Sequence, residues 1–164
     1  MTLAEAEYFY RQMGCTHFHM SREEPSKYDQ YKSLNITEEQ ERRWRCAEVA
    51  ELIELLSRQK PPQWNTLDSL LSVAERTEET LADVAFAAEK YAAVLNPLGK
   101  VIIAETILGC RNPLNSGTAK TARLKCDSDT ANRLKKLGFT LLKQAGTDAS
   151  LRKRIFEAFM HARC

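Results

Sequence analysis

The residue types that could do chemistry gather in the segment GCTHFHMSREEPSKYDQY, residues 14–31. This segment holds two of the three histidines and one of the five cysteines of the chain. Cys15, His17 and His19 form a C-x-H-x-H pattern. Alternate side chains of an extended backbone point the same way, so these three could reach one metal ion such as zinc. In a helix, His17 would point roughly 160 to 200° away from the other two. The pattern therefore predicts a metal site only if the segment is extended and other residues complete the ligand set.

Two other interpretations fit the same residues. A thiol enzyme would use Cys15 as the nucleophile and His17 or His19 as the base, but the spacing fixes neither their hydrogen bond nor an oxyanion-stabilising group. In a structural role, the histidines would hydrogen-bond to carboxylates or helix ends, while Phe18 and Met20 pack against the core. We expect this structural role, in which the segment fastens the first helix to the rest of the domain and requires no metal.

The stretch from residue 17 to residue 36 shows no clear helical periodicity, and a segment of this length without a helix is unusual in a compact domain. We expect a short helix over residues 28–34 that lies across the core. In the alternative, Tyr28 and Tyr31 line the wall of a binding groove together with His17 and His19. Tyrosine and histidine suit such a wall because each combines apolar area with a polar tip.

Basic residues concentrate in the C-terminal part of the chain. Residues 1–95 contain 11 Lys or Arg and 17 Asp or Glu, whereas residues 96–164 contain 13 and 5, so the two parts carry net charges of −6 and +8. The basic residues recur in three consecutive predicted helices, as Lys120, Arg123 and Lys125, then Arg133, Lys135 and Lys136, then Arg152, Lys153 and Arg154.

The last of these clusters, at 152–154, lies near the start of a predicted helix, where positive charge opposes the helix dipole by a few tenths to about 1 kcal/mol per charge. The simplest interpretation is a solvated face that balances the acidic N-terminal part, within one molecule or between copies. The alternatives are a surface for an acidic protein and a surface for phosphates or nucleic acid.

Helices are the elements predicted to position these residues. No alternating run rich in Val, Ile and Thr indicates strands, although the apolar triplet at 101–103 would also suit a buried strand. The sequence TEEQ, from Thr37 to Gln40, has the spacing of a capping box, and Gly109 and Gly146 follow apolar-periodic segments as helix ends do. Thr147 is expected to cap the last helix. The predicted helices cover about residues 3–13, 37–58, 67–74, 81–95, 97–108, 118–125, 134–145 and 147–162.

We therefore expect seven or eight helices in a single all-α domain, residues 1–164. From about residue 38 onward the helices group into hairpins of roughly 35 to 45 residues, the size of an armadillo or HEAT unit. The predicted architecture is a short armadillo/HEAT-like α-solenoid, and a compact orthogonal helical bundle is the alternative. The residues predicted for the core are Trp44, Leu52, Leu81, Val84, Leu95, Leu137 and Phe159.

The N-terminus and the cysteines indicate a cellular compartment. The first residues are acidic and aromatic, unlike a signal peptide, and no apolar stretch approaches the ~18 residues of a membrane helix. The five cysteines are widely spaced and contain no C-x-x-C pair, so they indicate neither a disulfide framework nor a zinc ribbon. We expect a soluble cytoplasmic protein with reduced thiols and no membrane partner.

Three functions are compatible with these features. The first is a non-enzymatic helical module that binds another protein, in particular an acidic one, or a second copy of itself. The second is a metal-dependent or thiol enzyme centred on Cys15, His17 and His19. The third is a domain that binds phosphate or nucleic acid through the basic C-terminal helices. The first function is the one that we expect, with no cofactor.

Overall fold

The computed structural model describes residues 1–74, 78–109 and 128–162, and within these ranges it contains helices and no strands. The predicted all-α class is confirmed, and the apolar triplet at 101–103 is helical. The described α-helices number nine: α1 (Leu3–Gln12), α2 (His17–Glu23), α3 (Pro25–Ser33), α4 (Glu38–Arg58), α5 (Trp64–Ala74), α6 (Leu81–Ala92), α7 (Pro97–Leu108), α8 (Ser128–Ala145) and α9 (Arg152–Ala162).

The prediction of seven or eight helices was wrong because residues 17–33, where only a short helix over 28–34 was expected in addition to the counted ones, form the two helices α2 and α3. α2 and α3 meet at Pro25, which is the first residue of α3 and suits that position because a helix needs no N–H there. The predicted helix at 118–125 lies outside the described residues.

Local signals set most of the helix ends. Thr37 caps α4 in the predicted capping box, with Gln40 accepting from the Thr37 backbone N–H. Gly109 follows α7 in a left-handed conformation, φ 72°, that favours glycine. The expected cap at Thr147 was wrong: the Asp148 carboxylate accepts from Ser150 N–H and begins a short 3-10 turn that leads into α9.

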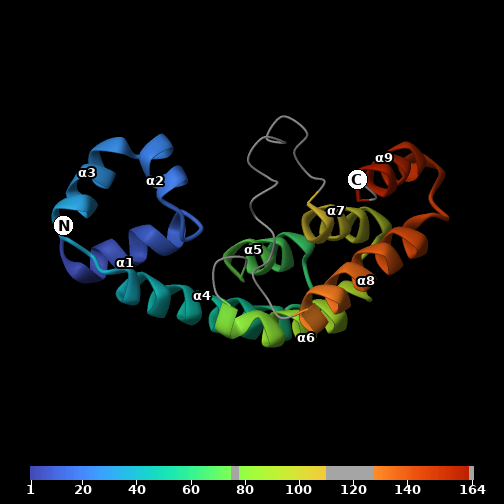
Figure 1. Cartoon of the computed structure of the whole chain (residues 1–164), viewed down its shortest axis with the longest axis horizontal. Coiled ribbons are helices and arrows are strands. Elements are labelled where there is room, and N and C mark those ends of the chain that lie inside the picture. Colours follow the sequence, from blue (N-terminus) through green and yellow to red (C-terminus); the bar gives the residue numbers. More distant parts are fainter. Residues whose placement is uncertain (75–77, 110–127, 163–164) are drawn as a thin grey trace.

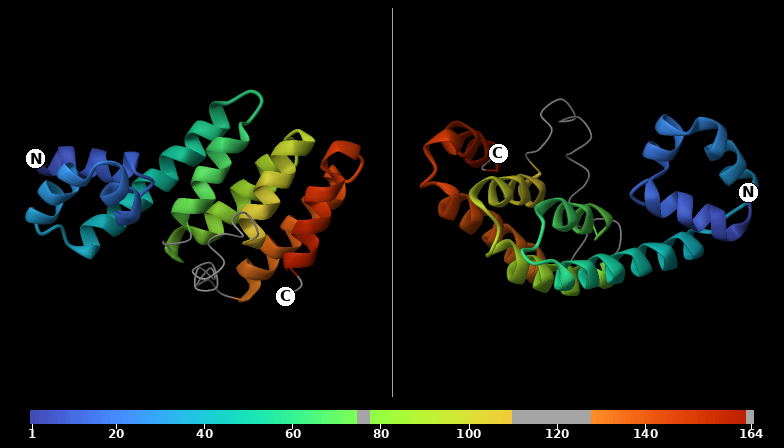
Figure 2. Two further views of the ribbon diagram at one scale, coloured as in Figure 1. Left: turned by 90° about the horizontal axis from the view of Figure 1, so that it is seen from above. Right: turned by 180° about the vertical axis from the view of Figure 1, so that it is seen from behind.

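Helices α4 to α9 pack in two layers. α4, α6 and α8 follow one another in one layer, and α5, α7 and α9 follow one another in the other, with each helix touching its neighbours in both layers. Seen from above, the helices lie side by side in chain order, and the row is curved and elongated (Figure 2). Each helix therefore packs mainly against helices close to it in the sequence.

Helices α1 to α3 form a separate group at the beginning of α4, which we call the N-terminal unit (Figure 1). α4 has 21 residues and is about 30 Å long, so its first half belongs to this unit and its second half to the two-layer array. No helix among the described residues is both long and apolar enough to span a bilayer.

The apolar core runs without interruption from α1 to α9. Four of the seven residues predicted for the core are buried, namely Trp44, Leu81, Val84 and Leu95. The other three, Leu52, Leu137 and Phe159, are only partly buried and pack against the edge of the core, because an array two helices thick leaves the rim of each helix in contact with solvent.

Candidate functional site

Glu41, in the first turn of α4, is the centre of a polar network that ties α2 and α3 to α4. Its Oε1 accepts a hydrogen bond from the Tyr31 hydroxyl at 2.7 Å and lies 2.7 Å from Nε2 of His17. A carboxylate can only accept, so Nε2 of His17 carries the donated proton. In the neutral ring, Nδ1 of His17 is then the acceptor for the Tyr28 hydroxyl, 3.0 Å away. The network therefore runs from Tyr28 through His17 to Glu41.

Arg45 extends this network to α1. Its guanidinium donates to the Tyr10 hydroxyl at 2.8 Å and lies 3.7 Å from Oε2 of Glu41, and its Nε is buried without a partner among the described residues. The rings of Tyr10 and Tyr31 are stacked, with centroids 6.0 Å apart. All four helices of this region thus contribute a side chain to one polar cluster, which we call the Glu41 network.

The electrostatics of the Glu41 network suit a structural role. Burial raises the pKa of Tyr10 to about 12. Burial and then the hydrogen bond to Glu41 raise the pKa of Tyr31. Both phenols stay protonated at neutral pH, with Tyr31 donating to Glu41 and Tyr10 accepting from Arg45, so neither is an activated nucleophile or base. The arrangement can hold the helices together.

The C-x-H-x-H segment does not have the conformation that the metal hypothesis needs. α2 begins at His17, so His17 and His19 face different ways: His17 points to Glu41, and His19 lies 3.1 Å from Glu23 of its own helix. Cys15 is buried just before α2, at a positive φ of 56°. Across the described ranges, no group of three or more His, Cys, Asp or Glu side chains could hold a metal ion.

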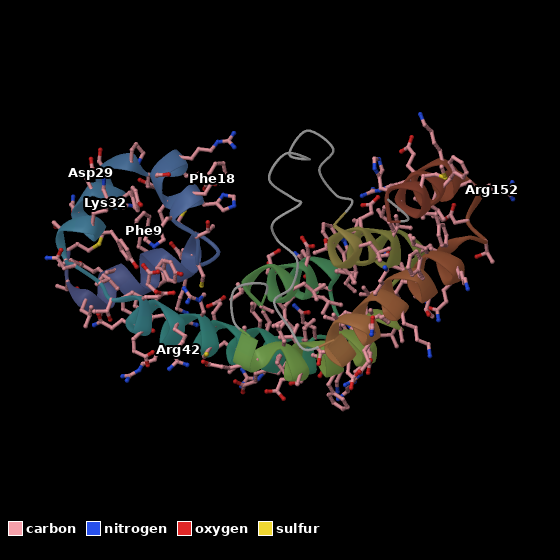
Figure 3. All side chains as sticks on the ribbon, in the orientation of Figure 1. Phe9, Phe18, Asp29, Lys32, Arg42 and Arg152 are labelled. Atoms are coloured by element: carbon pink, nitrogen blue, oxygen red, sulfur yellow. The ribbon has the colours of Figure 1, made fainter. Side chains whose placement is uncertain are left out.

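The expectation that both histidines hydrogen-bond to carboxylates is confirmed. Met20 is fully buried as predicted, but Phe18 is 62% exposed, so its predicted packing role was wrong. In a helix, Met20 shares the inner face with His17, three residues earlier, whereas Phe18 falls on the outer face. Phe18 lies on the outside of the N-terminal unit (Figure 3). Tyr31 is buried in the core and so does not line a groove, while Tyr28 is partly exposed.

The basic candidates divide into three groups. Lys120 and Arg123 lie outside the described residues. Arg154 forms a bidentate ion pair with the buried Glu105 of α7, with both N···O distances at 2.6 Å, and these hydrogen bonds raise the pKa of Arg154. The exposed group is Lys135 and Lys136 on α8 and Arg152 and Lys153 in the first turn of α9.

A groove between α4 and α6 was missed by the sequence analysis. Its volume is about 440 Å³, and Phe86 of α6 lines it with 65% of its surface exposed. A signal was present in the sequence, because Phe86 is out of phase with the apolar positions of its helix. The lining residues are Cys46, Val49, Ala50, Ile53, Thr80, Asp83, Phe86, Ala87, Lys90 and Tyr91.

A second and more polar groove, of about 350 Å³, lies between α1 and α4. Arg11 occupies it with three carboxylates around its guanidinium, at 2.7 Å from Glu48, at 3.7 Å from Glu7 and in contact with Glu51. The remaining lining residues are Ala4, Tyr8 and Gln12. Comparison with protein-family models, with curated proteins and with solved structures found no match to this chain.

Proposed function

We propose that this chain is a non-enzymatic protein-interaction module that binds an amphipathic helix of a partner protein in the α4/α6 groove. The observation that carries this proposal is the apolar hollow beside the exposed Phe86 ring. Large apolar side chains on the rim of a concave surface are typical of protein-binding sites. The order of the helices in two layers supports the α-solenoid interpretation, and such arrays commonly present extended binding surfaces.

The shape of the groove suits a helix. Ala50 and Ala87 are small and leave a hollow, while Ile53 and Phe86 supply larger apolar side chains beside them. A partner helix could place apolar side chains at positions i, i+3 and i+4 into this hollow, which is the usual way in which a helix occupies a hydrophobic groove.

Charges at the two ends of the groove define the partner further. Asp83 and Lys90 lie seven residues apart on α6, about 10 Å along the helix axis, and both are exposed. Neither forms an ion pair with another described residue. We therefore expect the partner helix to carry a basic residue and an acidic residue about seven positions apart, with the apolar residues between them.

A synthetic amphipathic peptide with this pattern tests the proposal. Its affinity for the wild-type chain, measured by isothermal titration calorimetry, should fall at least about tenfold for Phe86→Glu, because an aromatic anchor in an interface typically contributes ~2 kcal/mol or more. Phe18→Glu is the matched control, since Phe18 is equally exposed but lies on α2.

A peptide with its two charges exchanged should bind more weakly to the wild type and should regain affinity for a chain with Asp83→Lys and Lys90→Glu. Equal binding to wild type and Phe86→Glu, or no binding at all, would contradict the proposal.

A further inference from the structure

The outward face of α9 combines two basic side chains with an exposed aromatic ring, and one of the two, Lys153, lies 3.9 Å from Glu157 of the same helix. Arg152, Lys153 and Phe156 are all exposed, and Phe156 has 65% of its surface in solvent. These three positions fall on one side of the helix, because residues three and four apart are neighbours on a helix surface. Arg152 points away from the body of the molecule at one end of the array (Figure 3). We call this surface the α9 face.

The α1/α4 groove has the opposite character. Three glutamates surround one arginine, so this groove carries a local excess of negative charge. Glu51 is well exposed at its rim, and its Oε2 contacts Arg11. Tyr8 is 64% exposed beside Ala4, whose small side chain makes room for a ring.

The two surfaces lie at opposite ends of the long axis of the molecule, with α1 at one end and α9 at the other (Figures 1 and 2). One molecule therefore cannot bring them together. We propose that the α9 face of one copy docks into the α1/α4 groove of a second copy, with Phe156 against Ala4 and Tyr8 and with Arg152 and Lys153 toward Glu51 and Glu7. Such a head-to-tail contact uses two different surfaces, so it produces short chains of molecules or a closed ring.

Complementary charge makes this contact sensitive to salt. The charged groups are exposed on both surfaces, and interactions between exposed charges weaken as the ionic strength rises and the Debye length falls from about 10 Å at 0.1 M to about 3 Å at 1 M. Apolar contact through Phe156 contributes the part that salt does not screen. Self-association should thus be strongest at low ionic strength and at high protein concentration.

Analytical ultracentrifugation of the full chain over a concentration series, at low and high salt, tests the proposal. The wild type should form species larger than a monomer at low salt, and raising the salt should reduce them. The double variant Arg152→Glu/Lys153→Glu should weaken self-association at least about tenfold. The matched control is Lys135→Glu/Lys136→Glu, which changes the charge by the same amount on the exposed face of α8 and should leave self-association within about twofold of the wild type.

Exchanging the charges between the two surfaces tests whether they contact each other. Glu51→Lys should also weaken self-association, and mixing it with Arg152→Glu/Lys153→Glu should restore it, because each variant keeps one native surface and the two altered surfaces attract each other. A wild type that stays monomeric at low salt, an equal effect of the α8 control, or mixing without recovery would each overturn the proposal. Peptide binding in the α4/α6 groove should be unchanged by Arg152→Glu/Lys153→Glu, so that failure of one proposal is distinguishable from failure of the other.

Discussion

Replacing Tyr31 by phenylalanine removes one hydroxyl from the centre of the Glu41 network and leaves the ring in place. The hydroxyl is buried and donates to Oε1 of Glu41 at 2.7 Å. The ring keeps its stacking with Tyr10, so the substitution isolates the hydrogen bond from the packing. Tyr28→Phe is the matched control, because its hydroxyl meets a ring nitrogen of His17 in a more exposed position.

The magnitude follows from the charge on the acceptor. A hydrogen bond to a buried carboxylate contributes about 1.5 to 3 kcal/mol, more than a bond between neutral groups. His17 and Arg45 still contact Glu41 after the change, so the carboxylate is not left isolated and the loss stays within this range. The more exposed hydroxyl of Tyr28 should contribute about 1 kcal/mol or less.

The effect should depend on pH in a defined direction. The folded state raises the pKa of Tyr31, chiefly by burial and then through Glu41, above its ordinary value of 10.0. A phenol that ionises in the unfolded chain before it ionises in the folded chain contributes stability that is complete below pH 10 and declines as the pH rises through the folded pKa. The unfolding free energy of the wild type should therefore fall above about pH 10, because both Tyr10 and Tyr31 have raised pKa values. The unfolding free energy of Tyr31→Phe should fall less, so the difference in unfolding free energy between the two proteins should become smaller.

Urea denaturation followed by circular dichroism, at neutral pH and at a series of alkaline values, measures all of these quantities. The dependence of the unfolding free energy on urea should be the same for wild type and variant, so that a changed midpoint reports stability alone. If Tyr31→Phe is no more destabilising than Tyr28→Phe at neutral pH, Glu41 is not the centre of the network and the reasoning is wrong.

Two further substitutions probe the array. Arg154→Ala should destabilise the fold by about 1 to 3 kcal/mol in thermal melts, because it leaves the buried Glu105 carboxylate without its bidentate partner. The loss stays in this range because Arg154 is half exposed and water can reach its place. The control Lys153→Ala, at a highly exposed position, should change stability by less than about 0.5 kcal/mol. Gly138→Ala should cost about 1 to 3 kcal/mol, because an added Cβ would lie 2.9 Å from Leu108 Cγ where α8 packs on α7; adding Leu108→Ala should recover part of this loss, and no recovery would mean that the contact is not the cause.

The helices that carry strong local signals could be predicted from the sequence. α4 combines the Thr37 capping box with a long periodic segment, and α7 begins at Pro97 and ends before Gly109, so local rules set both ends. α2 has seven residues, too few for its periodicity to stand out. Its start is set by Thr16, whose hydroxyl accepts from Phe18 N–H, directly after the buried Cys15. Cys15 has a positive φ, a conformation that its residue type does not indicate.

The candidate sites could be predicted only in part, because they depend on residues far apart in the chain. His17, Tyr28 and Tyr31 stood out as polar and aromatic residues in an irregular segment, and the structure brings all three together. Glu41 and Arg45 did not stand out, since an acid in the first turn of a helix already complements the helix dipole and an arginine one turn later is an ordinary surface pair. Their burial becomes visible only when the N-terminal unit packs on α4.

α4 connects the N-terminal unit to the array, because it is one continuous helix that belongs to both. Its beginning carries the Glu41 network, and residues from Cys46 to Ile53, farther along the same helix, form one wall of the α4/α6 groove. If a helix binds in the groove as proposed, a tilt of α4 would move both the groove wall and the Glu41 network, and we expect the free energies of binding and of the network to be coupled. This coupling is reciprocal. A helix bound in the groove should slow amide hydrogen exchange in α1 to α3. Loosening the network at Glu41, about 7.5 Å along α4 from Cys46, the first lining residue of the groove on this helix, should weaken binding.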